Sequence, residues 1–150
     1  MPQGGLFETQ GPALIINIDG ASRGNPGPAA AGWVIRDERD DQVIIDEGLH
    51  LGRDTNNRAE YFALLFALED ALTLRAHTVR VLSDSELLVR QMRGEYRVKN
   101  ENLKPLFLRA RRLADCFAEF TVGHVPRSEN AAADRAANRA LDDLKAPKSP

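Results

Sequence analysis

The sequence is poor in cysteine and has no long apolar run. Cys116 is its single cysteine, which excludes an internal disulfide framework and a zinc site built from thiolates. Any metal site must therefore use oxygen or imidazole ligands, and we expect Cys116 to pack as a small hydrophobic residue. The longest apolar run covers only residues 61–68, whereas a helix that crosses a bilayer needs about 20 apolar residues. We therefore expect no membrane partner.

The first residues also lack the basic start and apolar stretch of a secretory signal, so we expect a cytoplasmic protein. The composition, with 43% hydrophobic and 28% charged residues in 150, is typical of one globular domain. Its net charge of -2 excludes a general attraction to nucleic acid and leaves only local patches. Glycine, proline and glutamine in the first twelve residues, and two prolines in the last five, predict a flexible leader over residues 1–12, a folded domain over 13–144 and a flexible tail over 145–150.

Hydrophobic periodicity and turn residues predict strands and helices in a definite order. The strands are expected over residues 14–19, 31–36, 42–51, 78–84 and 119–125, and the helices over 57–75, 85–94, 102–117 and 129–144. Ser128 is the expected N-cap of the last helix, whose many alanines would let it approach a sheet closely. The order βββαβααβα predicts an α/β fold, with a mixed five-stranded sheet flanked by helices. The first three strands should be antiparallel and the later ones parallel.

Four acidic residues are candidates for one site. Asp19 and Asp84 each end an apolar strand, and ligands bind at the carboxyl ends of strands in open α/β sheets. Glu60 is expected in the first turn of the central helix, and Asp134 in the first half of the last helix. Taken alone, each acid is more often a solvated charge or a cap. Together they would repel one another unless divalent cations lay between them, and oxygen ligands favour Mg²⁺ or Mn²⁺.

The motifs around these acids resemble those of the type 1 ribonuclease H family. They are DGASRGNPGP at 19–28, TNNRAE at 55–60, SDS at 83–85, HVPRSEN at 124–130 and AD at 133–134. The resemblance covers nearly all of residues 13–144 and is to the short bacterial and archaeal form, which lacks the basic protrusion of longer members. It implies a ribonuclease H-like sheet and hydrolysis of the RNA strand of RNA/DNA hybrids. Two Mg²⁺ ions, with Mn²⁺ as an alternative, would yield 3′-hydroxyl and 5′-phosphate ends with little sequence preference.

The resemblance also implies roles for individual residues. Asp19 would bridge both ions, Asp134 would hold the ion that activates water, and Glu60 with Asp84 would hold the ion beside the leaving oxygen. His124 would assist proton transfer or product release, with Arg127 as the alternative candidate. The implied substrate contacts are Gly20, Ala21, Ser22, Arg23, Gly24 and Asn57 on 2′-hydroxyls, Asn25 and Thr55 on a DNA phosphate, and Asn130.

Residues 88–112 hold eight basic side chains and two acidic ones, a local balance of +6. We take Arg90, Arg93, Arg97 and Lys99 as a candidate basic patch for phosphate contacts. The alternative is an ordinary solvated helix face. The expected partner is an RNA/DNA hybrid, with double-stranded RNA as a further candidate, and the protein is expected to be a monomer. Two other functions stay open: a catalytically silent duplex-binding module, or one domain of a larger enzyme.

Overall fold

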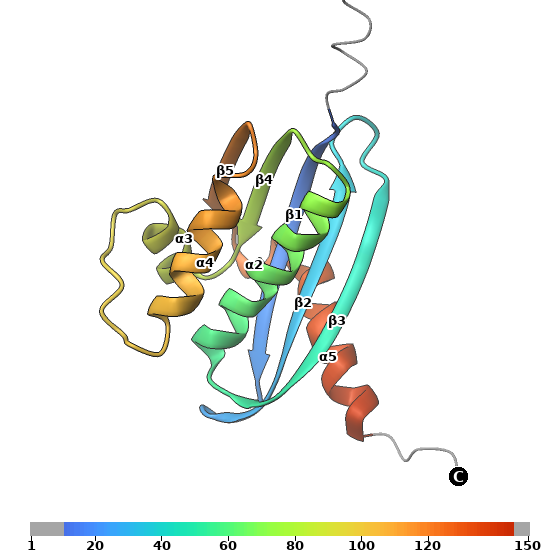
Figure 1. Cartoon of the computed structure of the whole chain (residues 1–150). Helices are drawn as coiled ribbons and strands as arrows, with labels where there is room; N and C mark the ends of the chain where they lie inside the picture. The colour runs from blue at the N-terminus through green and yellow to red at the C-terminus, as the bar shows by residue number, and fades with distance from the viewer. Residues whose placement is uncertain (1–10, 146–150) are drawn as a thin grey trace, which may run out of the picture.

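The computed structural model describes residues 11–145 (Figure 1). The predicted leader and tail therefore lie mostly outside the described residues. The strands are β1 (Ala13–Ser22), β2 (Gly27–Asp37), β3 (Val43–Asp54), β4 (Thr78–Ser83) and β5 (Glu119–His124). The helices are α2 (Asn56–Thr73), α3 (Glu86–Met92), α4 (Lys104–Ala114), the short 3₁₀ helix η1 (Arg127–Glu129) and α5 (Ala131–Lys145). None of the described helices combines the length and apolar character needed to cross a bilayer.

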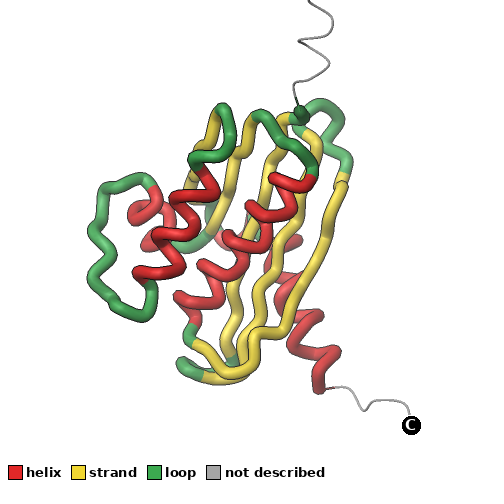
Figure 2. Tube along the Cα trace, viewed as in Figure 1, coloured by secondary structure: helices red, strands yellow, loops and turns green. Residues whose placement is uncertain are grey.

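The five strands form one mixed sheet in the order β3-β2-β1-β4-β5 (Figure 2). Strands β1, β2 and β3 pair antiparallel, whereas β4 lies parallel to both β1 and β5. Hairpins join the antiparallel strands, and helices make the crossovers to the parallel ones, as short and long connections require. The predicted element order, sheet and α/β class are confirmed.

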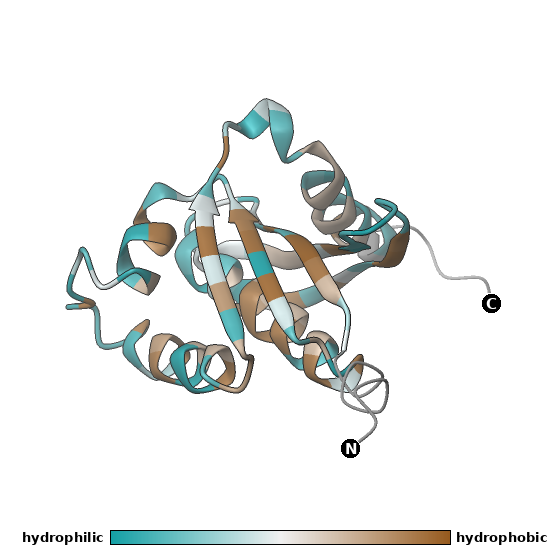
Figure 3. Cartoon of the chain, turned by 90° about the horizontal axis from the view of Figure 1, so that it is seen from above, coloured by the Kyte–Doolittle hydropathy of each residue, from teal (hydrophilic) through white to brown (hydrophobic). Residues whose placement is uncertain are grey.

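Helices cover both faces of this sheet. Helix α2 packs against β1 and β2 and also touches α4, while α5 packs against the other face of β2 and β3 (Figure 1). The main core lies between the sheet and α2, where Ile16, Ile18, Leu64 and Leu68 are fully buried. Seen from above, apolar residues mark the strands and the helix surfaces that face them (Figure 3). This core holds β1 rigidly beneath α2.

Two boundary differences change where functional residues lie. Strands β1 and β2 are longer than predicted because they stay paired as far as Ser22 and Ala29, which leaves only a tight turn between them. Helix α5 begins at Ala131 after η1. Ser128 therefore lies within η1 and does not cap α5, contrary to the prediction.

Small residues let α5 lie directly on the sheet, as its alanines predicted. A Cβ added to Gly32 would lie 2.4 Å from the carbonyl oxygen of Ala133, and one added to Gly48 would lie 2.1 Å from that of Ala136. The close contact needs the strand glycines as much as the helix alanines, because the backbone of α5 lies directly against the backbones of β2 and β3. This contact sets the height of α5, and therefore of Asp134, above the sheet.

Gly48→Ala should lower the free energy of unfolding by about 2 kcal/mol, because the new methyl group forces the α5 backbone away from β3. Urea unfolding followed by circular dichroism measures the change. Gly123→Ala is the matched control, since its Cβ would meet Leu82 at an ordinary 3.7 Å and should change stability by less than about 0.5 kcal/mol. Equal stabilities for the two variants would contradict this account of the α5 contact.

Candidate active site

Asp19 and Asp84 come from neighbouring parallel strands. In the register of these strands Ile18 lies beside Ser83, so Asp19 and Asp84 each follow the last residue of the pairing. Strand β4 ends at Ser83, one residue before its predicted end, so Asp84 directly follows the strand, whereas Asp19 lies within β1, which runs on to Ser22. That extension is held by β2 alone, and Asp19 is opposite Gly32 there. The site therefore forms where β4 stops and β1 continues.

Glu60 is brought to β1 by a direct backbone contact with Gly20. Helix α2 starts at Asn56, one residue earlier than predicted, so Glu60 lies just past its first turn rather than within it. The Gly20 amide donates a hydrogen bond to Glu60 Oε2 at 3.0 Å. A Cβ at position 20 would lie 2.2 Å from the Glu60 nitrogen. Only glycine permits this approach, so Gly20 positions Glu60 whatever else it contacts.

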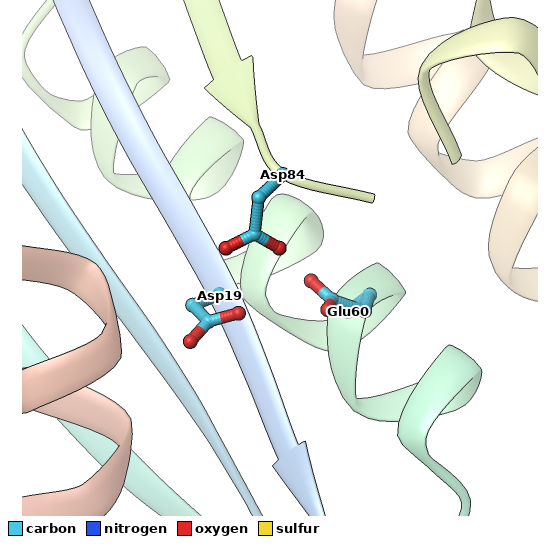
Figure 4. A group of neighbouring side chains, drawn as sticks. All are labelled: Asp19, Glu60 and Asp84. Carbon is cyan, nitrogen blue, oxygen red and sulfur yellow. The ribbon is translucent and has the colours of Figure 1, made fainter. Parts of the chain in front are cut away.

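The side chains of Asp19, Glu60 and Asp84 extend toward one another from β1, α2 and the end of β4 (Figure 4). Each offers an oxygen within 4.8 Å of the oxygens offered by the other two. Asp19 and Glu60 are 5% and 4% exposed, whereas Asp84 is half-buried. The fourth predicted acid, Asp134, comes from the first turn of α5 and lies within hydrogen-bonding reach of the Asp19 carboxyl. Three of the four predicted acids thus converge, and the fourth lies beside Asp19.

Burial and mutual repulsion make this cluster hard to ionise. Burial raises the pKa of Asp19 to about 8, with further contributions from the charges of Asp84 and Asp134. Burial also raises the pKa of Glu60 well above its usual range, and the charges of Asp19 and Asp84 add to that effect. Arg127 opposes both shifts, but only as a minor influence. Such a cluster lacks positive charge at its centre.

Divalent cations would supply the positive charge that this cluster of carboxylates needs. The donor set consists of carboxylate oxygens, which suit Mg²⁺ and Mn²⁺ rather than softer metals. The described residues of the cluster include no cysteine or histidine ligand. The residues that would hold such ions are Asp19, Glu60 and Asp84, with Asp134 beside Asp19.

The turn between β1 and β2 is tied to two other elements. Ser22 Oγ donates to the Asp54 carbonyl oxygen at 3.0 Å, and Arg23 donates to Asp142 of α5 at 2.7 Å. Gly24 has a φ of +115°, a backbone conformation that favours glycine. Ala21 and Ser22 are half-buried, whereas Arg23, Gly24 and Asn25 are exposed. The six residues of this turn that are predicted to contact substrate, 20–25, therefore run from a fixed position at Gly20 to an exposed tip.

A small polar pocket of about 240 Å³ lies beside this turn. It is lined by Asn25, Thr55, Asn57, Arg58, Asn100, Asn102 and Leu103, so it brings together three residues predicted to bind substrate. Thr55 also caps α2 by accepting a bond from the Arg58 amide. Arg58 itself bonds Asp54 at 2.8 Å and the Asn102 carbonyl oxygen at 2.6 Å. It joins the loop before α2 to the segment before α4, and so holds the pocket walls together.

His124 and Arg127 lie at the same edge of the sheet as the acids. His124 pairs with Ser83 in the strand register, and the Val125 amide donates to the Ser83 carbonyl oxygen at 2.9 Å. Both candidate side chains are exposed. Arg127 is near enough to lower the pKa of Asp19 and Glu60 slightly. Both remain candidates for assisting the reaction.

The candidate basic patch divides into two parts. Arg90 and Arg93 both contact Glu95, at 3.2 and 3.8 Å. Arg90 also stacks over the Tyr96 ring at 5.2 Å, and Arg93 donates to the Val122 carbonyl oxygen at 2.9 Å. Arg97 and Lys99, further along the same segment, are exposed. The first pair helps to hold the loop after α3, and the second pair presents its charge to solvent.

Two features differ from or add to the sequence analysis. Cys116 is exposed, with its Sγ near the Arg112 carbonyl oxygen, so the expectation that it packs as a small hydrophobic residue is wrong. Asn17, which the analysis missed, is buried and donates to Asn130 Oδ1 at 3.0 Å. The signal for Asn17 was available, since it is a polar residue within an apolar strand, two positions before Asp19 and on the same face.

The sequence of this chain is similar to those of known proteins. Residues 17–140 match the family model described as "Reverse transcriptase-like". Ribonuclease HI of Halobacterium salinarum is 44% identical over 126 residues, which are 84% of this chain and 63% of that protein. A bifunctional protein of Mycobacterium tuberculosis is 43% identical over 86% of this chain but only 35% of its own length. The chain thus spans about a third of the mycobacterial relative and under two thirds of the archaeal one.

The fold agrees with these sequence matches. The crystal structure of RNase H1 from Halobacterium salinarum superposes with a TM-score of 0.84 and 42% identity, covering 87% of this chain and 98% of that one. LC11-RNase H1, isolated from compost by a metagenomic approach, was solved in complex with an RNA/DNA hybrid. It superposes with a TM-score of 0.82 and 40% identity, over 89% of this chain and 99% of that one. With the acidic cluster and its motifs, these matches show that the chain belongs to the type 1 ribonuclease H family.

Proposed function

We propose that this chain hydrolyses the RNA strand of RNA/DNA hybrids, using two divalent ions held by its acidic cluster. The observation that carries the proposal is the convergence of Asp19, Glu60 and Asp84 within 4.8 Å. Partly desolvated acids that repel one another are costly to keep, and a module that only binds duplexes has no use for them. Family membership and the hybrid bound by LC11-RNase H1 support the same substrate.

We assign a role in the reaction to each residue of the site according to its position. Asp19, which lies close to Glu60 and Asp84 and beside Asp134, would contact both ions. Asp134 would hold the ion on the water side, and Glu60 with Asp84 the ion on the leaving-group side. When bound, a pair of divalent ions activates water and stabilises the leaving oxygen of an in-line displacement. Cleavage by this route leaves 3′-hydroxyl and 5′-phosphate ends. His124, at the end of β5, would move a proton or help to release the product phosphate, and the exposed Arg127 is the alternative.

Substrate selection would come from contacts that do not read base sequence. The RNA strand differs from DNA by its 2′-hydroxyl groups, which we assign to the turn at residues 20–24 together with Asn57. The polar pocket that includes Asn25 and Thr55 would take a phosphate of the DNA strand. Asn130 is buried, so we assign it support of the site rather than a direct contact with substrate.

Incubation with labelled duplexes tests this function. RNA/DNA, RNA/RNA and DNA/DNA duplexes of one sequence would be treated with the protein in Mg²⁺ or in EDTA, and the products resolved on a gel. We expect cleavage of the RNA strand of the hybrid in Mg²⁺ only. Comparable cleavage of DNA/DNA, or undiminished activity in EDTA, would contradict the proposal. Binding of the hybrid without cleavage in Mg²⁺ would favour the silent binding module, and cutting of RNA/RNA would add a second substrate.

The exposed half of the basic patch should affect substrate binding more than turnover. Arg97→Glu combined with Lys99→Glu should raise KM about tenfold with less change in kcat, and should flatten the dependence of hybrid binding on salt. The control is the same charge change at two other exposed residues, Arg80→Glu with Arg112→Glu. If KM and its salt slope match those of the control, residues 97–99 are an ordinary solvated segment.

A further inference from the structure

A chain of side-chain hydrogen bonds joins the acidic cluster to the far part of β2. Arg36 donates to Asn17 Oδ1 at 3.2 Å, and Asn17 Nδ2 donates to Asn130 Oδ1 at 3.0 Å. Asn130 Nδ2 then donates to the Ile18 carbonyl oxygen at 2.8 Å and to Asp84 Oδ2 at 3.2 Å. Asn17 and Asn130 are 6% and 1% exposed. These amides are therefore shielded from exchange of partners with water.

The two ends of this chain determine which way both amides face. A guanidinium only donates hydrogen bonds and never accepts them. Arg36 therefore requires the oxygen of Asn17, which turns the Asn17 amino group toward Asn130. Asn130 must therefore accept this hydrogen bond with its oxygen, so its own amino group faces Asp84. With the opposite orientation, the Asn130 oxygen would face two other acceptors, the Ile18 carbonyl and the Asp84 carboxylate.

Asp84 is the acid that most needs such support. Asp19 is held within a paired strand, and Glu60 accepts a bond from the Gly20 amide. Asp84 instead lies just beyond the end of β4 and is half-buried. Repulsion from the other two carboxylates would turn it outward, and the Asn130 amino group provides an opposing attraction.

We propose that Asn17 and Arg36 are positioning residues for the metal site: they orient the Asn130 amide, which holds the Asp84 carboxylate in the cluster. The proposal rests on the proposed function, because it assumes that the cluster binds divalent ions. Neither residue reaches the reacting atoms, so each acts only through its neighbour. Partners that orient metal ligands in this way commonly affect metal affinity by about 10- to 100-fold.

Asn17→Asp is the sharpest test because it keeps the shape and reverses the hydrogen bonding. An aspartate only accepts, so Asn130 would turn its amino group toward position 17 and its oxygen toward Asp84. We expect about tenfold weaker Mn²⁺ binding by the free protein, measured by isothermal titration calorimetry. General electrostatics predicts the opposite, since an added negative charge attracts cations. Gln42→Glu, an equal charge change at an exposed residue, controls for that effect.

Changes at Arg36 test the same relay from outside the core. Arg36→Lys keeps a group that only donates and should leave Mn²⁺ affinity unchanged. Arg36→Gln introduces an amide that can either donate or accept, so it no longer fixes the orientation of the Asn17 amide. If both amide orientations are then equally populated, Mn²⁺ binding weakens roughly twofold. Melting in EDTA accompanies each titration, because a merely structural loss would lower the melting temperature without changing the affinity of the folded protein.

The outcomes separate this proposal from the proposed function. A wild-type protein that binds Mn²⁺ and cleaves hybrids, with unchanged Mn²⁺ affinity in Asn17→Asp, would overturn the relay and leave the enzyme intact. Equal losses in Asn17→Asp and Gln42→Glu would overturn it as well. A wild-type protein that binds no Mn²⁺ would overturn the metal site itself. Weaker binding in Asn17→Asp, with wild-type binding in Arg36→Lys, would support the relay.

Discussion

Asp19→Asn should abolish cleavage of RNA/DNA hybrids while binding of the hybrid persists. Asp19 lies close to Glu60 and Asp84 and also beside Asp134, so its loss would remove the ligand that we assign to both ions. We expect a fall in kcat of at least about 10³-fold, or roughly 4 kcal/mol of transition-state stabilisation. Single-turnover cleavage in Mg²⁺ and hybrid binding in Ca²⁺ by fluorescence anisotropy measure the two quantities separately.

Asp40→Asn is the matched control for this substitution. Asp40 is exposed in the turn between β2 and β3, and its Oδ1 accepts from the Gln42 amide, which asparagine can also do. This variant should cleave at the wild-type rate. Full activity of Asp19→Asn would remove the central ligand from the proposed mechanism. Loss of hybrid binding together with cleavage would show that Asp19 supports the fold of the substrate surface instead.

The second large effect is on stability in the absence of metal. In EDTA, wild type should lose stability relative to Asp19→Asn as the pH rises from about 5 to about 8. Burial raises the pKa of Asp19 from 3.8 to about 8 and also raises that of Glu60, so the folded state binds these protons more tightly than the unfolded state. The stability that these protons contribute is complete below the pKa of the unfolded state. It is lost as the pH rises through the pKa of the folded state.

The expected loss is on the order of 3 kcal/mol, less than the full shift of Asp19 implies, because neighbouring acids share protons. Urea unfolding at several pH values, with both proteins in EDTA, measures the difference between them. Millimolar Mg²⁺ should restore the stability of wild type at pH 8 more than that of Asp19→Asn, since a ligand that binds only the folded state stabilises it. A difference that does not vary with pH would mean that the acids do not form one electrostatic unit.

The fold and the acids could be predicted because their signals are local. Apolar runs, turn residues and the motifs around Asp19, Glu60 and Asp84 each lie within about ten residues of sequence. The position of Asp19 within β1 was missed because the apolar run stops at Gly20, while pairing with β2 carries the strand further. Pairing partners override such local signals.

Contacts between distant residues could not be predicted from local patterns. Asn17 and Asn130 are 113 positions apart, and no periodicity connects them. The prediction for Cys116 failed for a different reason. The predicted helix over 102–117 included Cys116, but α4 ends at Ala114, so Cys116 lies in the turn beyond it and is exposed.

The four acids also come from three different layers of the molecule. Asp19 and Asp84 belong to the sheet, Glu60 to α2 on one face, and Asp134 to α5, which rests on glycines of the other face. An ion shared among them would act as a non-covalent cross-link through the thickness of the domain. Chelation would then do more than stop catalysis, because α5 would lose this link and keep its packing on the sheet and its ion pairs, such as Arg23 with Asp142. Loading with metal should accordingly make the C-terminal helix and the central helix unfold as one cooperative unit.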